Sequence, residues 1–187
     1  DRCLSRGLGD VYKRQMPAAG KGEFAAILAD RGIPVRSMGD MVRAEVRDRG
    51  IKEAPHVFGE VASDLRAKYG DDVLAQRLTE AVDELLVDNE IVLIEGLRGV
   101  AEREVFSKHW GVNFLVAAVT ASKALRFERV QSRARSEDGD LSDLETRDKR
   151  ETGWGLDVII QDADFSFSNE SDLEDLKTQV SAWLDNL

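Results

Sequence analysis

Two short apolar runs constrain the fold of this chain more than any other feature. Ile91–Ile94 and Phe114–Val119 are uninterrupted series of aliphatic or aromatic residues. A strand without polar alternation is typical of a parallel sheet covered by helices on both faces, because both sets of its side chains are then buried. Helical periodicity fills the sequence around the two runs, so strands and helices alternate. This order predicts an α/β fold with a doubly wound parallel sheet.

The expected elements follow one another along the chain from Met16 onward. The expected helices cover residues 21–31, 40–48, 56–68, 71–88, 101–109, 122–133 and 141–152. A final helix is expected to begin at a capping box formed by Ser171 and Glu174 and to turn Leu173, Leu176, Val180, Trp183 and Leu184 toward the core. The expected strands cover 33–38, 91–94, 114–119 and 164–168, the last of them at an edge of the sheet.

Composition places the chain among ordinary globular proteins. Its 187 residues are 42% hydrophobic and 33% charged, with a formal charge of −10, and this length favours one domain with a sizeable core. The excess of acid argues against nucleic acid as a partner. No apolar run approaches the roughly 18–20 residues of a membrane span, and one cysteine fits a reducing compartment. We therefore expect a cytoplasmic protein with small-molecule partners, and composition leaves its oligomeric state open.

Residues 1–15 differ from the rest of the chain. They carry four basic and two acidic side chains and the only cysteine, Cys3. No periodicity runs through them, apart from Val11 and Tyr12, which suit an extended stretch. The run from Cys3 to Gln15 also resembles translated sequencing-adapter strings. We expect a non-native segment at 1–15 and a single domain at 16–187, with a native basic arm as the alternative.

The turn before the first expected helix resembles a phosphate-binding loop. Residues 15–22, Gln-Met-Pro-Ala-Ala-Gly-Lys-Gly, nearly match the pattern Gly-x-x-x-x-Gly-Lys-[Ser/Thr]. In such a loop, backbone N–H groups converge on an anion at a helix N-terminus and the lysine reaches the outer phosphates. Gln15 replaces the first glycine and Gly22 replaces the hydroxyl residue. The match alone therefore leaves an ordinary helix start as the alternative.

Polar motifs also follow two of the expected strands. Gly-Asp-Met-x-Arg at 39–43 comes after the strand at 33–38, and Glu-Gly-Leu-Arg at 95–98 comes after the run at 91–94. Ligands of open α/β sheets bind outside the carboxyl ends of the strands, so both motifs are expected at one site. An arginine cluster follows these motifs, and guanidinium groups can neutralise a phosphoryl group in transfer. The alternative for this cluster is a solvated helix face. The members of the cluster are Arg126, Arg129, Arg133, Arg135, Arg147 and Arg150.

Together these motifs resemble the nucleoside monophosphate kinases, P-loop phosphotransferases of the adenylate kinase type. The segments PAAGKGEF, SMGDMVRAE, IVLIEGLRG and RFERVQSRARSEDG are most similar to an archaeal branch of that superfamily, labelled adenylate-kinase-like or dephospho-CoA-kinase-like. The resemblance covers about residues 16–187. It implies a three-layer P-loop NTPase-type fold with strand order 2-3-1-4-5, an acceptor-binding region at about 39–70 and a helical lid at about 130–152.

The resemblance also implies roles for individual residues. The residues implied to bind ATP are Ala18, Ala19, Gly20, Lys21, Gly22 and Glu23, although Glu23 stands where adenylate kinases have threonine. Those implied to bind the acceptor are Asp40, Arg43 and Arg98, and those implied in catalysis are Lys21, Arg129, Arg133, Arg135 and Arg147. Glu95 would orient Mg²⁺ through water. Trp154 is expected to pack beside the lid, with stacking on a base as the alternative.

The implied activity is ATP-dependent transfer of a phosphoryl group to a small acceptor, with a nucleoside monophosphate as the first choice. Such a transfer needs positioning, charge neutralisation and exclusion of water rather than a covalent intermediate. A dephospho-CoA-kinase-like acceptor is the alternative among enzymes. A non-catalytic nucleotide-binding regulator is the alternative from another class of protein, motivated by Gln15 and Glu95.

Overall fold

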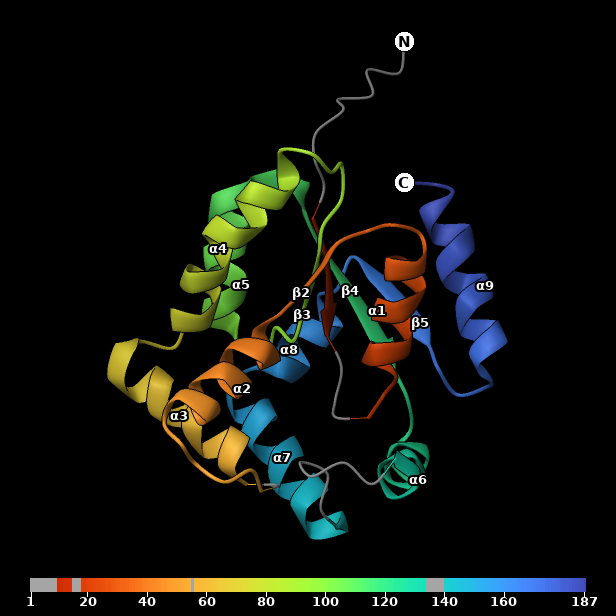
Figure 1. Ribbon diagram of the computed structural model, residues 1–187. Helices are drawn as coiled ribbons and strands as arrows, with labels where there is room; N and C mark the ends of the chain where they lie inside the picture. The colour runs from red at the N-terminus through yellow and green to blue at the C-terminus, as the bar shows by residue number, and fades with distance from the viewer. Residues whose placement is uncertain (1–9, 15–17, 55, 134–139) are drawn as a thin grey trace.

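A parallel sheet of five strands forms the centre of the protein, whose computed structural model describes residues 10–14, 18–54, 56–133 and 140–187. The strands are β1 (Asp10–Arg14), β2 (Val35–Ser37), β3 (Leu93–Glu95), β4 (Phe114–Thr120) and β5 (Phe165–Ser168). Their order in the sheet is β2-β3-β1-β4-β5. The doubly wound order expected from the sequence is confirmed, with β5 at an edge (Figure 1).

Helices cover both faces of this sheet, which gives the three layers of the fold (Figure 1). They are α1 (Lys21–Asp30), α2 (Met38–Asp48), α3 (Val57–Tyr69), α4 (Val73–Leu86), α5 (Val100–Trp110), α6 (Lys123–Arg133), α7 (Leu141–Gly153), α8 (Leu156–Gln161) and α9 (Leu173–Leu184). Each expected helix is present, whereas α8 and a 3-10 turn at Gly111–Asn113 were not expected from the sequence. Among the described residues, no helix is long and apolar enough to cross a membrane.

The first face of the sheet is covered by α1 and α9. Phe24 of α1 is fully buried there, in one cluster with Phe167 of β5 and Val180 of α9. The ring of Trp183 joins this cluster, with its centroid 5.8 Å from that of Phe24 and 5.3 Å from that of Phe167. Aromatic rings at such distances and tilted angles pack favourably. This layer therefore holds α1, and with it the loop that precedes α1, against the sheet.

The second face is covered by α2 to α5 and α8. Leu65, Phe106 and Ile159 come from three of these helices and meet Ile94 of β3 in one buried cluster. The neighbouring residue of β3, Leu93, belongs instead to the cluster under α1 and α9. Successive side chains of a strand point to opposite faces. The uninterrupted apolar run therefore reflects burial on both sides, as predicted.

β1 lies in the middle of the sheet and pairs on both of its edges. Val11 is in register with Leu93 of β3 and with Leu115 of β4, and both pairings are parallel. A strand in this position pairs backbone groups that would otherwise be buried without partners. Val11 and Tyr12, which were expected to suit an extended stretch, lie within this strand, which runs from Asp10 to Arg14.

The start of α9 corrects one expectation. Asp172, not Ser171, is the N-cap, and its side chain accepts a 3.0 Å hydrogen bond from the backbone N–H of Asp175. The helix therefore begins one residue later than the expected capping box. Leu173, expected in the core, is 44% exposed, whereas Leu176 and Val180 are buried as predicted.

We predict that apolar residues at the two charged positions of β1 stabilise the protein. Lys13 and Arg14 occupy a central parallel strand, where charged residues are costly unless they reach water or a partner. Lys13→Val combined with Arg14→Ile should raise the melting temperature by about 5 °C. The control is Lys149→Val on the exposed side of α7. An equal or lower melting temperature in the β1 variant would contradict the prediction.

Candidate functional site

The loop between β1 and α1 has the backbone of an anion-binding turn. Gly20 has a φ of 108°, and its carbonyl accepts the first helical hydrogen bond of α1, from Phe24 N at 3.1 Å. Ala18, which is 5% exposed, has a φ of 64°. This region of φ is costly for a residue with a side chain and is seen most often at functional sites. The loop therefore presents the N-terminus of α1, where unpaired N–H groups attract anions.

Asn169 holds this loop in place from the end of β5. Its side-chain N–H₂ donates to the carbonyl of Ala19 at 2.9 Å. A Cβ atom on Gly20 would lie 1.9 Å from the same nitrogen, so only glycine allows this close approach. Arg129 of α6 donates to the backbone oxygen of Asn169 at 3.0 Å. The sequence analysis missed Asn169, whose one signal was its position just after an expected strand.

A pocket opens between this loop and α6, and we call it the loop pocket. Its volume is about 580 Å³. Gly20, Lys21 and Glu23 line it from the loop and α1, and Arg129 lines it from α6. Arg129 was expected in catalysis; it faces this pocket and is fixed through Asn169. Arg133 is the last residue of α6, and Arg135 lies outside the described residues, so the roles of both arginines stay predictions.

Lys21 and Glu95 stand side by side at the centre of the site. The Nζ atom of Lys21 lies 3.6 Å from Oε1 of Glu95, the last residue of β3. The pKa of Lys21 is lowered from 10.5 to about 8, chiefly by burial and then by the neighbouring positive charge of Arg98, while Glu95 opposes this shift. The fold thus places a lysine beside the phosphate-binding loop at a cost in solvation. A bound anion would offset that cost.

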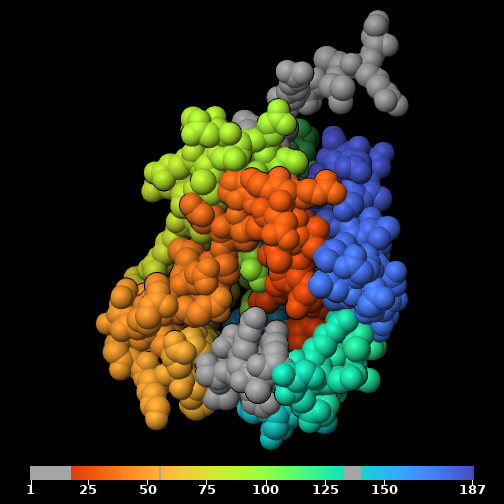
Figure 2. All heavy atoms as spheres, turned by 45° about the vertical axis from the view of Figure 1, so that its right-hand side comes forward, coloured from red at the N-terminus to blue at the C-terminus, as the bar shows by residue number. Residues whose placement is uncertain are grey.

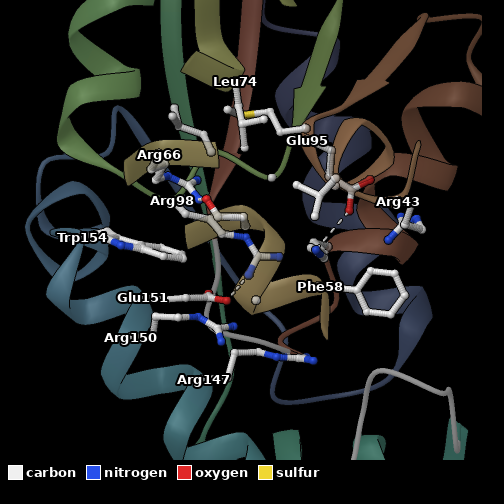
Figure 3. Close-up of a pocket in the computed structure, with 18 of the residues that line it drawn as sticks. Arg43, Phe58, Arg66, Leu74, Glu95, Arg98, Arg147, Arg150, Glu151 and Trp154 are labelled. Atoms are coloured by element: carbon white, nitrogen blue, oxygen red, sulfur yellow. Dashed lines mark hydrogen bonds and ion pairs between the residues drawn. The ribbon is translucent and has the colours of Figure 1, made fainter. Parts of the chain in front are cut away.

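A second pocket lies on the other side of Lys21, between α2, α3 and α7, and we call it the arginine pocket. Its volume is about 280 Å³. Figure 2 shows the molecule hollowed between α1 and the segment of α2 and α3. Its cationic lining residues are Lys21, Arg43, Arg66, Arg98, Arg147 and Arg150 (Figure 3). The two carboxylates among its lining residues are Glu95 and Glu151. The lining therefore carries an excess of positive charge.

Asp40 and Arg43, expected to bind the acceptor, form an ion pair on α2. The Nη2 atom of Arg43 lies 3.0 Å from Oδ1 of Asp40. Arg43 lines the arginine pocket. The Asp40 side chain is 70% exposed and is not among the residues that line this pocket. The structure therefore places Arg43 at the site, with Asp40 as its partner one turn away.

Arg98, the third residue expected to bind the acceptor, also lines the arginine pocket. Its Nη1 group donates to Glu151 of α7, whose side chain is 1% exposed (Figure 3). The backbone N–H of Arg98 donates to Oε2 of Glu102 at 2.8 Å. Glu151 and Glu102 were not singled out from the sequence. Glu102 had a signal, because it stands three residues after Gly99 at the capping-box spacing of α5.

Arg66 and Glu102 form a buried ion pair behind the pocket. The Nη2 atom of Arg66 lies 2.6 Å from Oε1 of Glu102, and the two side chains are 5% and 0% exposed. Arg66 also donates to the carbonyl of Ala62 at 3.1 Å. Its guanidinium carbon lies 4.2 Å from the ring centre of Trp154, a cation–π contact. The pair therefore joins α3, the start of α5 and the end of α7.

Arg150 of α7 packs against the same tryptophan. Its guanidinium carbon lies 5.6 Å from the ring centre of Trp154, and burial lowers the pKa of Arg150. The Nε atom of Arg150 is buried without a hydrogen-bond partner. A Cβ atom on Gly59 of α3 would lie 2.0 Å from Nη1 of Arg150, so glycine lets the arginine reach into the pocket. Trp154 thus has the packing role expected for it.

The region expected to form a lid, about 130–152, begins near the end of α6 and continues through α7, and these two helices are joined. Arg126 of α6 makes two hydrogen bonds to Asp148 of α7, at 2.9 and 2.6 Å, and is 4% exposed. Lys123 and Glu145 form a second contact between these helices, at 2.6 Å. Arg126, a member of the arginine cluster, is therefore a structural link, while Arg147 lines the arginine pocket. The segment 134–139 between the helices lies outside the described residues.

This combination of fold and loop is that of a P-loop protein. Shikimate kinase from Acinetobacter baumannii, solved in complex with shikimate, superposes with a TM-score of 0.58 at 17% identity and covers 96% of this chain and 94% of its own. At such low identity the likeness shows the fold alone. It confirms the three-layer P-loop fold expected from the sequence.

The family follows from closer relatives. The AAA domain family matches residues 16–147. A UPF0200 protein of Methanosarcina barkeri is 38% identical over 172 residues, which are 91% of each chain. The UPF0200/UPF0201 protein of Archaeoglobus fulgidus is 39% identical over 165 residues, and this chain spans only 51% of its length. The chain therefore belongs to the UPF0200 family, within the AAA domain family of P-loop proteins. The finer subtype expected from the sequence stays a prediction.

We predict that anion binding at the loop weakens as the pH rises through about 8. Lys21 has a pKa of about 8 because it is buried, so it is protonated below this pH and neutral above it. Calorimetric titration with ATP, between about pH 7 and 9.5, should show the loss of affinity. Lys21→Arg should give a flat profile, because a guanidinium stays charged. A flat profile in the unmodified protein would contradict the prediction.

We predict that Gly59→Ala weakens anion binding in the arginine pocket without unfolding the protein. The new Cβ would displace the end of Arg150, while alanine suits a helix better than glycine by about 1 kcal/mol. Affinity for inorganic phosphate should fall about fivefold with an unchanged or higher melting temperature. The matched control is Gly153→Ala, where a Cβ meets nothing within 4 Å. Equal phosphate affinity in both variants would disprove the role of Arg150.

Proposed function

We propose that the protein is an ATP-dependent phosphotransferase that acts on a small phosphorylated acceptor, a nucleoside monophosphate in the first place. One observation carries this proposal: the loop pocket and the arginine pocket meet, and Ala18, Lys21, Gly22 and Glu95 line both. Direct transfer requires two ligands whose phosphates meet at one point, with charge neutralised there. Lys21 stands at that point.

The loop pocket fits the donor nucleotide. The N-terminus of α1 and Gly20 suit the β- and γ-phosphates, and Lys21 supplies a positive charge. When bound, Mg²⁺ would neutralise part of the charge of these phosphates. Glu95 is the carboxylate that would hold the ion through water, and Glu23 lines the same pocket. These residues are oxygen donors of the kind that Mg²⁺ prefers.

The arginine pocket fits a phosphorylated acceptor. Planar guanidinium groups bind phosphate through paired hydrogen bonds, and five arginines line this pocket. Its remaining wall is partly apolar and includes Val42 and Phe58, a surface suited to the organic part of a nucleotide. Phe58 and Trp154 lie at opposite ends of the pocket (Figure 3). The excess of cations favours an acceptor that already carries a phosphate over a neutral one.

A coupled assay with ATP, Mg²⁺ and a panel of nucleoside monophosphates tests this proposal. Lys21→Ala should reduce turnover by about a thousandfold, because the charge at the transferring phosphate is lost. Arg43→Ala should raise the KM of the monophosphate by tenfold or more and leave that of ATP within about twofold, since Arg43 lines only the arginine pocket.

Arg47→Ala is the matched control, because this arginine is exposed on the same helix as Arg43. Full turnover in Lys21→Ala would contradict the assignment of the loop pocket to ATP. Equal effects of Arg43→Ala on the KM of both nucleotides would contradict separate pockets for donor and acceptor. Turnover with dephospho-CoA but with none of the nucleoside monophosphates would identify the alternative acceptor. Binding of ATP without turnover of any acceptor would favour a nucleotide-binding regulator instead.

A further inference from the structure

Glu151 is a buried carboxylate on a helix whose other charged residues reach solvent to some degree. Leu144 and Glu151 are the buried residues described in α7. At 1% exposure, Glu151 has given up its hydration, which is costly for a carboxylate unless a cation compensates. Its partner is the guanidinium of Arg98, which itself lines the arginine pocket. The contact joins positions 53 residues apart in the chain.

Arg98 is held by carboxylates at both of its polar ends. Glu102 accepts from its backbone N–H at 2.8 Å, and Glu151 accepts from its guanidinium. The end of α7 that carries Glu151 is also attached to the segment that follows Arg98. There the carbonyl of Trp154 accepts a 3.1 Å hydrogen bond from Val100 N. The backbone and the side chain of Arg98 are thus fixed by two neighbouring elements, α5 and α7.

We propose that Glu151 is a positioning residue, which sets the direction of the Arg98 guanidinium and offsets part of its charge. This inference rests on the proposed function, because it assigns Arg98 to the acceptor phosphate. With one edge held by Glu151, Arg98 offers its remaining N–H groups to the pocket in a single orientation. The acceptor phosphate is therefore held in the orientation that transfer needs. Its affinity is lower than the full positive charge of Arg98 would allow.

Removal of the Glu151 charge should have opposite effects on binding and on turnover. Without the carboxylate, Arg98 is a cation whose charge an incoming anion compensates, so anion affinity rises. The same arginine is then free to rotate, and the acceptor is misplaced for transfer. A residue that only stabilises the fold would lower affinity and turnover together. The split between the two measurements is therefore specific to positioning.

The test uses Glu151→Gln in the full chain, with binding and turnover measured separately. Calorimetry with AMP and with inorganic phosphate should show affinities about tenfold above those of the unmodified protein. In the coupled assay with AMP, kcat should fall about tenfold, while the KM of ATP stays within about twofold. The control is Glu145→Gln on the same helix, at a half-exposed position that pairs with Lys123, and it should change neither quantity.

Two further variants guard against loss of folding. Glu151→Asp keeps the charge but shortens the reach, so kcat should fall while anion affinity stays near that of the unmodified protein. In an Arg98→Met background, Glu151→Gln should have a much smaller effect on kcat, because Glu151 positions the acceptor through Arg98; its charge also reaches Lys21 and Arg150, so a small effect on anion affinity remains. Circular dichroism confirms that each variant is folded before its constants are compared.

Several results would overturn the inference. These are unchanged phosphate and AMP affinity in Glu151→Gln, equal losses for ATP and AMP, or a full effect in the Arg98→Met background. If the unmodified protein binds AMP but transfers no phosphoryl group, the proposed function fails. The rise in phosphate and AMP affinity in Glu151→Gln then still decides whether Glu151 offsets the charge of Arg98.

Discussion

The buried ion pair between Arg66 and Glu102 is the interaction on which the geometry of the arginine pocket depends. Both charges have left water, and removal of one partner from such a pair typically costs about 3–5 kcal/mol. The pair is tolerated because each partner has further contacts: Glu102 accepts from two backbone N–H groups, and Arg66 donates to Ala62 and lies over Trp154. Three elements, α3, α5 and the end of α7, are therefore held in one arrangement, and the loop that carries Arg98 is fixed between them.

The charges of the pocket follow from this arrangement. Four of its cations have a carboxylate beside them: Lys21 has Glu95, Arg43 has Asp40, Arg66 has Glu102 and Arg98 has Glu151. The carboxylates hold the cations at fixed positions inside a protein whose formal charge is −10. Arg147 and Arg150 add two further positive charges to the lining. Under the proposed function, this local excess of cations would attract an anionic acceptor to a protein whose net charge is negative.

The parallel sheet and the phosphate-binding loop could be predicted because their signals are local, whereas the order of the strands came from the resemblance to the adenylate kinase type. An apolar run reports a strand buried on both faces, and Gly20-Lys21 lies within a single turn. The partners of the site residues could not be predicted in this way, since Asn169 is 150 residues from Ala19 and Glu151 is 53 residues from Arg98. Helical periodicity does place Arg66 one turn after Ala62, on the side of α3 that faces the core. It gives no reason to expect a buried arginine there, because the reason is Glu102 on another helix.

Lys21 and Glu95 make the two pockets one electrostatic unit. Both residues line both pockets, and an anion in either one favours the protonated form of Lys21. Under the proposed function, binding of the first ligand would therefore increase the protonated fraction of Lys21 that the second ligand meets, and the effect would be reciprocal. A lysine with the ordinary pKa of 10.5 would be fully charged near neutral pH and would transmit nothing. Burial lowers the pKa of Lys21 to about 8, so this coupling grows as the pH approaches and passes that value. Under the proposed function, the partial desolvation of Lys21 would thus let an anion in one pocket favour the charge that a ligand in the other pocket meets.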